Sequence, residues 1–172
     1  MIDTGKQHSN DKQNVVLFVY GAGGHKTEMK RLAARLQATA IDGQFNYITL
    51  GDGAISSDAL AHFDSVDIRD KHSRLTSLLH IIPIMFGLIR NLIRIHRQYN
   101  IVGVVSTGPG IALLPFLFYR FRGVKTVFLE TFCRFETKSY TGRLIYFLSD
   151  RFLVQNKELL RLYPNAEYCG RL

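Results

Sequence analysis

The sequence predicts a single α/β domain built on a doubly wound parallel sheet. Three observations support this prediction: a length of 172 residues, apolar runs that alternate with helical patterns, and glycine turns after two of the runs. Continuously apolar runs are typical of strands covered on both faces, as in a parallel sheet between helices. We expect residues 1–14 to be a flexible tail and residues 15–172 to be the domain.

The elements follow from these patterns in order along the chain. Strands are expected at 15–21, 45–51, 65–69, 101–108, 125–131, 151–155 and 166–170. A first crossover helix is indicated by the i, i+3, i+4, i+7 spacing of Met29, Leu32, Ala33 and Leu36. Further helices are expected at about 73–99, 110–121, 141–149 and 157–163. Because such folds bind ligands beyond the carboxyl ends of their strands, the loops there are the candidate sites.

The composition excludes several classes of protein. With 47% hydrophobic and 21% charged residues, the chain is not disordered, collagen-like or a coiled coil. The two cysteines, Cys133 and Cys169, are too few for a disulfide framework and fit a reducing cytoplasm. The first 14 residues are polar, unlike a signal peptide. No Cys and His cluster has metal-site spacing, so we expect no metal and no cofactor.

The positive charge is concentrated in the middle third of the chain. The net charge is +8, and residues 71–125 contain eight basic residues and no Asp or Glu. This third is also the most apolar part, a combination suited to a membrane surface that carries anionic lipid. A nucleic-acid face more often mixes its charges with polar and aromatic residues, so we expect no nucleic-acid partner.

Residues 75–99 are the candidate membrane-associating segment. The apolar stretch at 81–89 includes Pro83 and Gly87 and is well short of the roughly 20 residues that a membrane span requires. One face of the expected helix carries Arg90, Arg94 and Arg97, and the other carries Ile81, Met85, Leu88, Leu92 and Ile95. An ordinary crossover helix whose apolar face covers the sheet would show the same pattern.

A second stretch favours the membrane reading. The apolar run at 113–118 ends in Tyr119, Arg120, Phe121 and Arg122, aromatic and basic residues of the kind found at the headgroup level. We therefore expect Arg90, Arg94, Arg97, Arg120 and Arg122 to contact the membrane, with the chain lying on its surface or entering one leaflet.

Three loops can carry chemistry. In GAGGHKTEM, at 21–29, Gly23 and Gly24 let the backbone approach a ligand at a helix start, a seat for phosphate. The helix dipole disfavours protonation of His25, which can then accept a proton or merely cap the turn. In STGPG, at 106–110, we expect Pro109 in the first helical turn and Thr107, Gly108 and Gly110 at an anion, although an ordinary turn has the same composition.

The third loop follows the fifth strand. Glu130 stands at the expected carboxyl end of that strand, where it can orient a sugar hydroxyl or act as a base. Arg134 and Lys138 lie just beyond and can neutralise phosphate. Glu130 can equally pair with Arg134 or cap the next helix.

Together these loops resemble a known family. The segments are GAGGHKTEM, STGPGIALLP, ETFCRFETKSYTGRLIYFLSDRFLVQ and YPNAEYCGRL, in that order from 21 to 172. They resemble the membrane-anchoring subunit of the bipartite N-acetylglucosaminyltransferase of dicarbohydrate-lipid synthesis, and more closely its bacterial exopolysaccharide counterparts of the PssD type. The N-terminal half of MurG has a related Gly-Gly-His loop and a glutamate after its fifth strand.

The resemblance implies a Rossmann-like domain equivalent to the N-terminal half of a GT-B glycosyltransferase. It implies that this chain binds a lipid-linked diphosphate-sugar acceptor at the cytoplasmic face of the inner membrane and recruits a separate UDP-sugar-binding subunit. His25 is then the first candidate for the base of an inverting transfer and Glu130 the second. The eukaryotic subunit begins with a transmembrane anchor; we expect none here and expect surface attachment through 75–99 instead.

Two other functions remain open from the sequence. One is a noncatalytic membrane scaffold that positions a complete transferase. The other is a stand-alone sugar-nucleotide enzyme such as an epimerase, which the length disfavours because a two-domain GT-B enzyme needs roughly twice this chain.

Overall fold

A seven-stranded parallel sheet forms the centre of the computed structural model, which describes residues 12–40, 45–65 and 76–172. The strands lie in the order β3-β2-β1-β4-β5-β6-β7, and every neighbouring pair is parallel. Their bounds are β1 (Asn14–Val19), β2 (Tyr47–Gly51), β3 (His62–Asp64), β4 (Asn100–Ser106), β5 (Lys125–Leu129), β6 (Arg151–Val154) and β7 (Glu167–Tyr168). The predicted doubly wound fold is confirmed.

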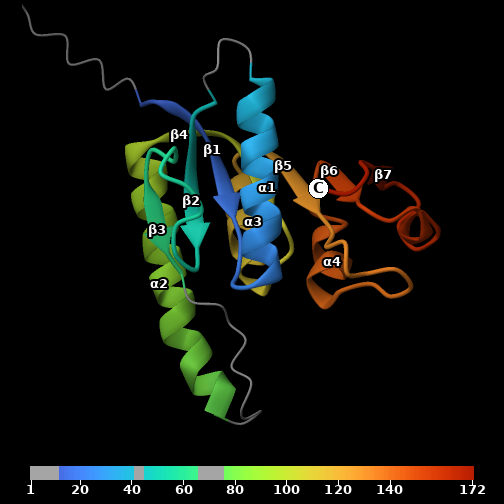
Figure 1. Cartoon of the computed structure of the whole chain (residues 1–172). Coiled ribbons are helices and arrows are strands. Elements are labelled where there is room, and N and C mark those ends of the chain that lie inside the picture. Colours follow the sequence, from blue (N-terminus) through green and yellow to red (C-terminus); the bar gives the residue numbers. More distant parts are fainter. Residues whose placement is uncertain (1–11, 41–44, 66–75) are drawn as a thin grey trace, which may run out of the picture.

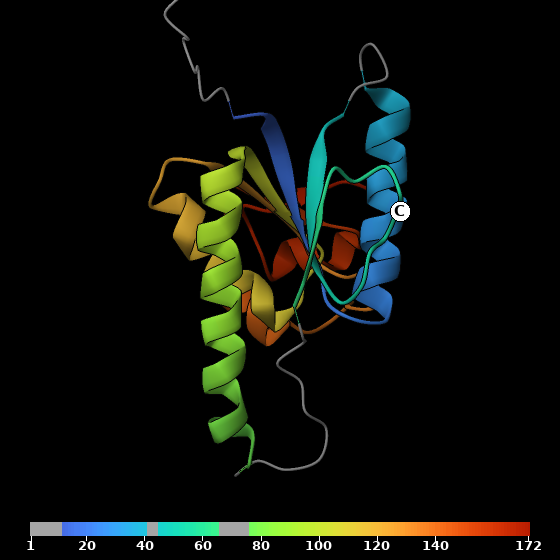
Figure 2. The same ribbon diagram turned by 90° about the vertical axis from the view of Figure 1, so that its left-hand side faces the viewer.

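Helices cover both faces of the sheet. They are α1 (Gly24–Thr39), α2 (Thr76–Gln98), α3 (Leu113–Arg120) and α4 (Tyr140–Ile145), with 3₁₀ turns η2 (Gly110–Ala112) and η3 (Lys157–Arg161). Figure 2 shows the sheet nearly edge-on, with α1 on one side and α2 on the other. In Figure 1, one end of α2 extends past the strands at the end where their arrows point.

Two apolar cores result from this layering. Between the sheet and α1 lie Phe18, Tyr20, Met29, Ala33, Tyr47 and Ile55. The larger core, on the other face, combines strand residues with Leu88, Leu92 and Ile95 of α2, Phe116 and Tyr119 of α3, and Ile145 of α4. Because α2, α3 and α4 share this core, they form one helical layer.

Several elements differ from the expectations. The third strand is His62–Asp64 rather than 65–69, because His62, Phe63 and Asp64 pair with Thr49, Leu50 and Gly51; residues 66–69 lie outside the described residues. The helix expected at 157–163 is a 3₁₀ turn over Lys157–Arg161, and the helix expected at 141–149 ends at Ile145. The helix expected at 110–121 begins as a 3₁₀ turn, and Pro109 immediately precedes that turn instead of lying in it.

The described part of the chain begins at residue 12, just before β1. Asn14 is the first residue of β1, and the Gln13 carbonyl accepts a hydrogen bond from Asn100 N–H at 3.0 Å. The rest of the expected tail, 1–11, lies outside the described residues.

The topology places the site between β1 and β4. These neighbouring strands are followed by α1 and α3, which pack on opposite faces of the sheet. Their two loops therefore diverge at the carboxyl edge and leave a crevice, the usual ligand position in doubly wound folds.

Candidate functional site

The loop after β1 places a histidine at the start of α1. Gly23 has a φ angle of 65°, a left-handed conformation open to glycine, and it turns the chain into the helix that begins at Gly24. Thr27 donates its backbone N–H to the Gly23 carbonyl at 3.1 Å and closes the first turn. His25 thus lies where the helix dipole favours an anion, as predicted.

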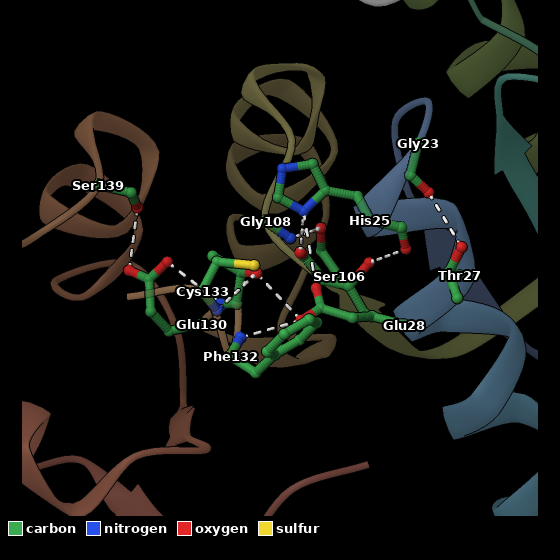
Figure 3. A network of polar contacts seen from close by, with 12 residues as sticks. Gly23, His25, Thr27, Glu28, Ser106, Gly108, Glu130, Phe132, Cys133 and Ser139 are labelled. Carbon is green, nitrogen blue, oxygen red and sulfur yellow. Dashed lines mark hydrogen bonds and ion pairs between the residues drawn. The ribbon is translucent and has the colours of Figure 1, made fainter. Parts of the chain in front are cut away.

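His25 is fixed by the loop after β4. Its Nδ1 lies 2.6 Å from the Thr107 carbonyl oxygen, and the Thr107 hydroxyl donates to the His25 carbonyl at 2.8 Å. Since a carbonyl oxygen only accepts, the neutral ring carries its proton on Nδ1 and its lone pair on Nε2. Figure 3 shows the ring between α1 and Gly108. A Cβ at Gly108, whose φ is +113°, would come within 2.9 Å of the imidazole.

Glu28 connects α1 to the segment after β5, and the sequence analysis did not select it. The side chain is buried, and its Oε1 accepts hydrogen bonds from Thr131 Oγ1 at 3.0 Å, Phe132 N–H at 2.9 Å and Gln155 Nε2 at 3.2 Å. Its Oε2 lies 3.8 Å from Nδ1 of His25. A carboxylate there favours the imidazolium that forms when His25 accepts a proton. The i, i+3 spacing of the two residues on one helix was the available signal.

Glu130 lines the cavity but is almost completely buried. Its Oε2 accepts hydrogen bonds from Ser139 Oγ at 2.9 Å and Tyr163 OH at 3.1 Å, and its Oε1 accepts one from Thr131 N–H at 3.3 Å. Burial raises the pKa of this carboxyl group, and the three hydrogen bonds offset only part of that rise. A raised pKa strengthens a base, but the oxygen atoms of Glu130 already hold the structure around α4.

The Glu130 carboxylate positions the residue that caps α4. Ser139 donates to Glu130 and also caps α4, accepting a hydrogen bond from Gly142 N–H at 2.8 Å. A Cβ at Gly142 would overlap with Oε2 of Glu130 and lie 2.6 Å from Ser139 Oγ. Glycine at 142 is thus required for the close approach of Glu130, Ser139 and Tyr163.

The loop residues expected at an anion are only partly available. The Thr107 hydroxyl is used by the His25 carbonyl, and Ser106 Oγ accepts from Gly108 N–H at 3.3 Å. Arg134 donates to Thr137 Oγ1 at 3.1 Å, while Asn156 Nδ2 binds the carbonyls of Phe132 and Arg134, each at 2.6 Å. Asn156, which sequence reasoning missed, fixes the backbone that carries Arg134.

These segments enclose one cavity of about 610 Å³ at the carboxyl edge. Its lining includes Gly24, His25, Gly108, Gly110, Glu130 and Arg134 from the predicted set, together with Ala22, Pro109, Thr131, Cys133, Ser139, Tyr140 and Thr141. Gly23 and Thr107 stand behind this lining and shape the two loops. The volume falls within the usual range of small-molecule sites, about 300–1,000 Å³.

Comparisons with known proteins agree with this architecture. The family profile described as "Oligosaccharide biosynthesis protein Alg14 like" matches residues 16–172. The chain belongs to this family. Over 181 residues it is 29% identical to the Homo sapiens protein named UDP-N-acetylglucosamine transferase subunit ALG14, covering 91% of this chain and 82% of that one.

Fungal relatives carry the same name. The Kluyveromyces lactis protein is 26% identical over 190 residues, covering 93% of this chain and 79% of its own. The Schizosaccharomyces pombe protein is 29% identical over 184 residues, covering 92% and 83%. These relatives come from eukaryotes, so the bacterial exopolysaccharide context stays a prediction.

The expected membrane segment presents two apolar stripes. Leu88, Leu92 and Ile95 are buried in the core, so this stripe covers the sheet as in an ordinary crossover helix. Met85 is partly buried, and the side chain of Ile81 lies outside the described residues. A second stripe, missed by the sequence analysis, is exposed and consists of Ile82, Phe86, Ile89 and Ile93; we call it the α2 stripe.

The basic residues of this region differ in their surroundings. Arg90, Arg94 and Arg97 are exposed on α2. Arg120 forms an ion pair with Asp150 at 3.3 Å, and the Arg122 guanidinium lies 3.6 Å from the centre of the Phe118 ring. Within the described part of the chain, no helix has the length and apolar character needed to cross a bilayer.

Proposed function

We propose that this chain is the acceptor-binding subunit of a two-component inverting glycosyltransferase. It binds a lipid-linked diphosphate-sugar at the cytoplasmic face of a membrane and recruits a separate subunit that binds the UDP-sugar. The observation that carries the proposal is the cavity, which brings two glycine turns, His25 and Arg134 together at the carboxyl edge. The relatives' common name, a UDP-N-acetylglucosamine transferase subunit, supports the reaction class.

The cavity suits a diphosphate in three ways. The first turn of α1 contributes backbone N–H groups and the positive end of a helix dipole. Gly108 and Gly110 let the second loop approach a ligand closely. Arg134 contributes a guanidinium from the third side. A diphosphate bound there would place the attached sugar near His25, with the lipid outside the cavity.

The reaction then needs a base at the acceptor hydroxyl. The hydroxyl oxygen attacks the anomeric carbon of the donor sugar, and its proton passes to Nε2 of His25. The new carbon–oxygen bond forms as the bond to UDP breaks, and UDP leaves with the electron pair, so the configuration inverts. Nδ1–H remains bound to the Thr107 carbonyl, which keeps the ring oriented. Glu28 stabilises the imidazolium.

Attachment to the membrane is assigned to α2. The α2 stripe lies beside Arg90, Arg94 and Arg97 on a helix that extends past the sheet (Figures 1 and 2). Exposed apolar side chains next to basic ones suit an anionic lipid surface. A bacterial exopolysaccharide or related lipid-linked pathway is the setting we propose.

The test of the function compares the chain alone with its native complex. The complex is purified from the source membranes through a tag on this chain, and both samples receive UDP-N-acetylglucosamine and prenyl-diphosphate-sugar acceptors. We expect sugar transfer by the complex and none by the isolated chain, while the isolated chain still binds a short prenyl diphosphate in calorimetry. Robust transfer by the isolated chain would refute the two-component proposal.

Attachment has its own test with vesicles. The triple variant Arg90→Glu, Arg94→Glu, Arg97→Glu should be released from vesicles containing phosphatidylserine, since each basic residue at an anionic surface contributes about 1 kcal/mol. The matched control reverses Lys30, Arg31 and Arg35, three exposed residues of α1 on the other face of the sheet. Unchanged sedimentation of the α2 variant at low salt would assign attachment to apolar burial instead.

A further inference from the structure

A second exposed apolar stripe lies on α4 and the turn that follows it. Tyr140, Leu144 and Phe147 occupy positions i, i+4 and i+7, and their side chains are 89%, 55% and 78% exposed. We call them the α4 stripe. Ile145, on the opposite side of the same helix, is fully buried in the core. The helix is therefore firmly seated, and its exposed stripe is not a consequence of poor packing.

The charged residues nearest to the α4 stripe in the sequence are basic. Residues 137–149 contain Lys138 and Arg143 and no Asp or Glu. The Arg143 guanidinium lies 5.8 Å from the centre of the Tyr140 ring, so a basic group accompanies the most exposed aromatic side chain. Mixed aromatic, aliphatic and basic residues of this kind are enriched where proteins meet lipid headgroups.

The α4 stripe belongs to the same helical layer as the α2 stripe. α3 contacts both α2 and α4, and all three helices contribute to one core. On α2, Asn91 Nδ2 donates to the Asp64 carbonyl at 3.0 Å, so that flank of the helix faces β3. His96 packs edge-on against Phe118 of α3, so the opposite flank faces α3. At 100° per residue, the α2 stripe falls on the α3 flank, the side toward α4.

The α4 stripe also begins at the cavity. Tyr140 lines the cavity wall, whereas Leu144 and Phe147 continue the stripe away from it along the chain. The cavity therefore borders the α4 stripe at Tyr140. Figure 1 shows α4 and the protruding end of α2 on the side of the molecule toward which the strand arrows point.

We infer that the α4 stripe is a second contact with an anionic lipid bilayer. With α2 as the first contact, the chain attaches at two points, and the mouth of the cavity is held at the headgroup level. A lipid-linked acceptor then reaches the cavity without leaving the bilayer. The inference rests on the proposed surface attachment and adds a contact to it. Charge complementarity supports an anionic bilayer as the occupant, because Lys138 and Arg143, within residues 137–149, are cations beside exposed aromatic and aliphatic side chains.

The experiment uses introduced tryptophan, since the chain contains none. Phe147→Trp reports on the α4 stripe, Phe86→Trp on the α2 stripe, and Leu60→Trp is the matched control at an exposed site in the loop between β2 and β3. Each variant of the full chain is titrated with vesicles of 70% phosphatidylcholine and 30% phosphatidylserine, with or without brominated lipid. We expect blue-shifted emission and bromine quenching at positions 147 and 86 and neither at position 60.

The outcomes separate the inference from the proposed function. Insertion at position 86 without insertion at 147 refutes the α4 contact and leaves the α2 attachment intact; the α4 stripe is then assigned to the partner subunit. Insertion at 147 alone supports the α4 contact and refutes attachment through α2. Absence of insertion at both positions refutes the two together.

A charge substitution supplies an independent measurement. The double variant Leu144→Glu, Phe147→Glu should weaken binding to the same vesicles by about tenfold or more, because it adds two anions and removes two apolar groups. Leu60→Glu should leave binding unchanged. Circular dichroism of each variant checks the fold, and wild-type affinity in the folded double variant would overturn the inference.

Discussion

The two candidate bases of the cavity, His25 and Glu130, are held in opposite ways. Backbone and neighbouring loop groups hold His25: its Nδ1 lies against a carbonyl oxygen, and its ring lies against Gly108. Glu130 is held by the side chains of Ser139, which caps α4, and Tyr163, which follows η3. The difference supports the proposed role of His25 as the base, whereas the contacts of Glu130 are those of a residue that holds the cavity lining together.

The largest expected effect comes from removing the imidazole. His25→Ala should lower kcat of the assembled complex by at least about 10²-fold, within the 10²- to 10⁴-fold range of general base catalysis, with a smaller change in donor KM. Steady-state kinetics of the complex measures both. The fold, partner binding and vesicle binding should persist, because the ring contacts loop backbone rather than the core.

Two other results would change this assignment. A larger loss in Glu130→Gln than in His25→Ala would make Glu130 the base and leave His25 to position the diphosphate. Near-normal rates in both variants would remove the chain from the chemical step and support the alternative function, a noncatalytic membrane scaffold.

The sequence predicted the parts of the site that depend on local patterns. Strand hydrophobicity and glycine turns located β1, β4, α1 and the position of His25, because these features follow from neighbouring residues. The third strand was misplaced because His62–Asp64 is polar at both ends, and only its pairing with β2 makes it a strand.

Long-range contacts account for what the sequence did not predict. Glu28 contacts Thr131 and Gln155 across more than one hundred positions of chain, so a local pattern could indicate only its proximity to His25 and not these contacts. On α2, periodicity identified one apolar stripe but could not show whether that stripe contacts the sheet or a membrane. Burial in the folded chain decides that question.

A substitution at Gly142 tests the close packing around Glu130. Gly142→Ala should lower the free energy of unfolding by about 1–3 kcal/mol, because the new Cβ must displace Glu130 Oε2 and Ser139 Oγ. Urea denaturation of the isolated chain measures the change. The control is Gly87→Ala, within α2, where a Cβ would meet nothing within 4 Å and alanine should stabilise the helix by about 0.5–1 kcal/mol. If both substitutions changed the free energy of unfolding in the same direction and by the same amount, the packing argument for Gly142 would be contradicted.

Substitutions of Glu28 test the connection between α1 and the segment after β5. Glu28→Ala should cost about 1–3 kcal/mol of stability, because Phe132 N–H and Gln155 Nε2 lose their buried acceptor. Glu28→Gln keeps an acceptor oxygen there and should retain most of that stability. It removes the charge 3.8 Å from His25, so kcat of the complex should fall several-fold, roughly 1 kcal/mol at the transition state. An unchanged kcat in Glu28→Gln would show that Glu28 acts only in folding.

The smallest expected effect is a pH dependence that belongs to Glu130 alone. Burial raises the pKa of this group above its ordinary value of 4.5. Between the unfolded and folded pKa values, the folded chain keeps a proton that the unfolded chain has lost. The stability of the wild type therefore falls as pH rises through this window, and the loss persists above it. Glu130→Gln cannot ionise, so its stability relative to the wild type should increase from about pH 4.5 upward and then level off.

Urea denaturation across this pH range measures the difference in stability. The control is Glu136→Gln, at an exposed glutamate, whose stability should follow that of the wild type. If the stability of Glu130→Gln relative to the wild type decreased with pH instead, the hydrogen bonds from Ser139 and Tyr163 would outweigh burial. The folded protein would then favour the ionised form of Glu130, the form in which a carboxyl group can act as a base.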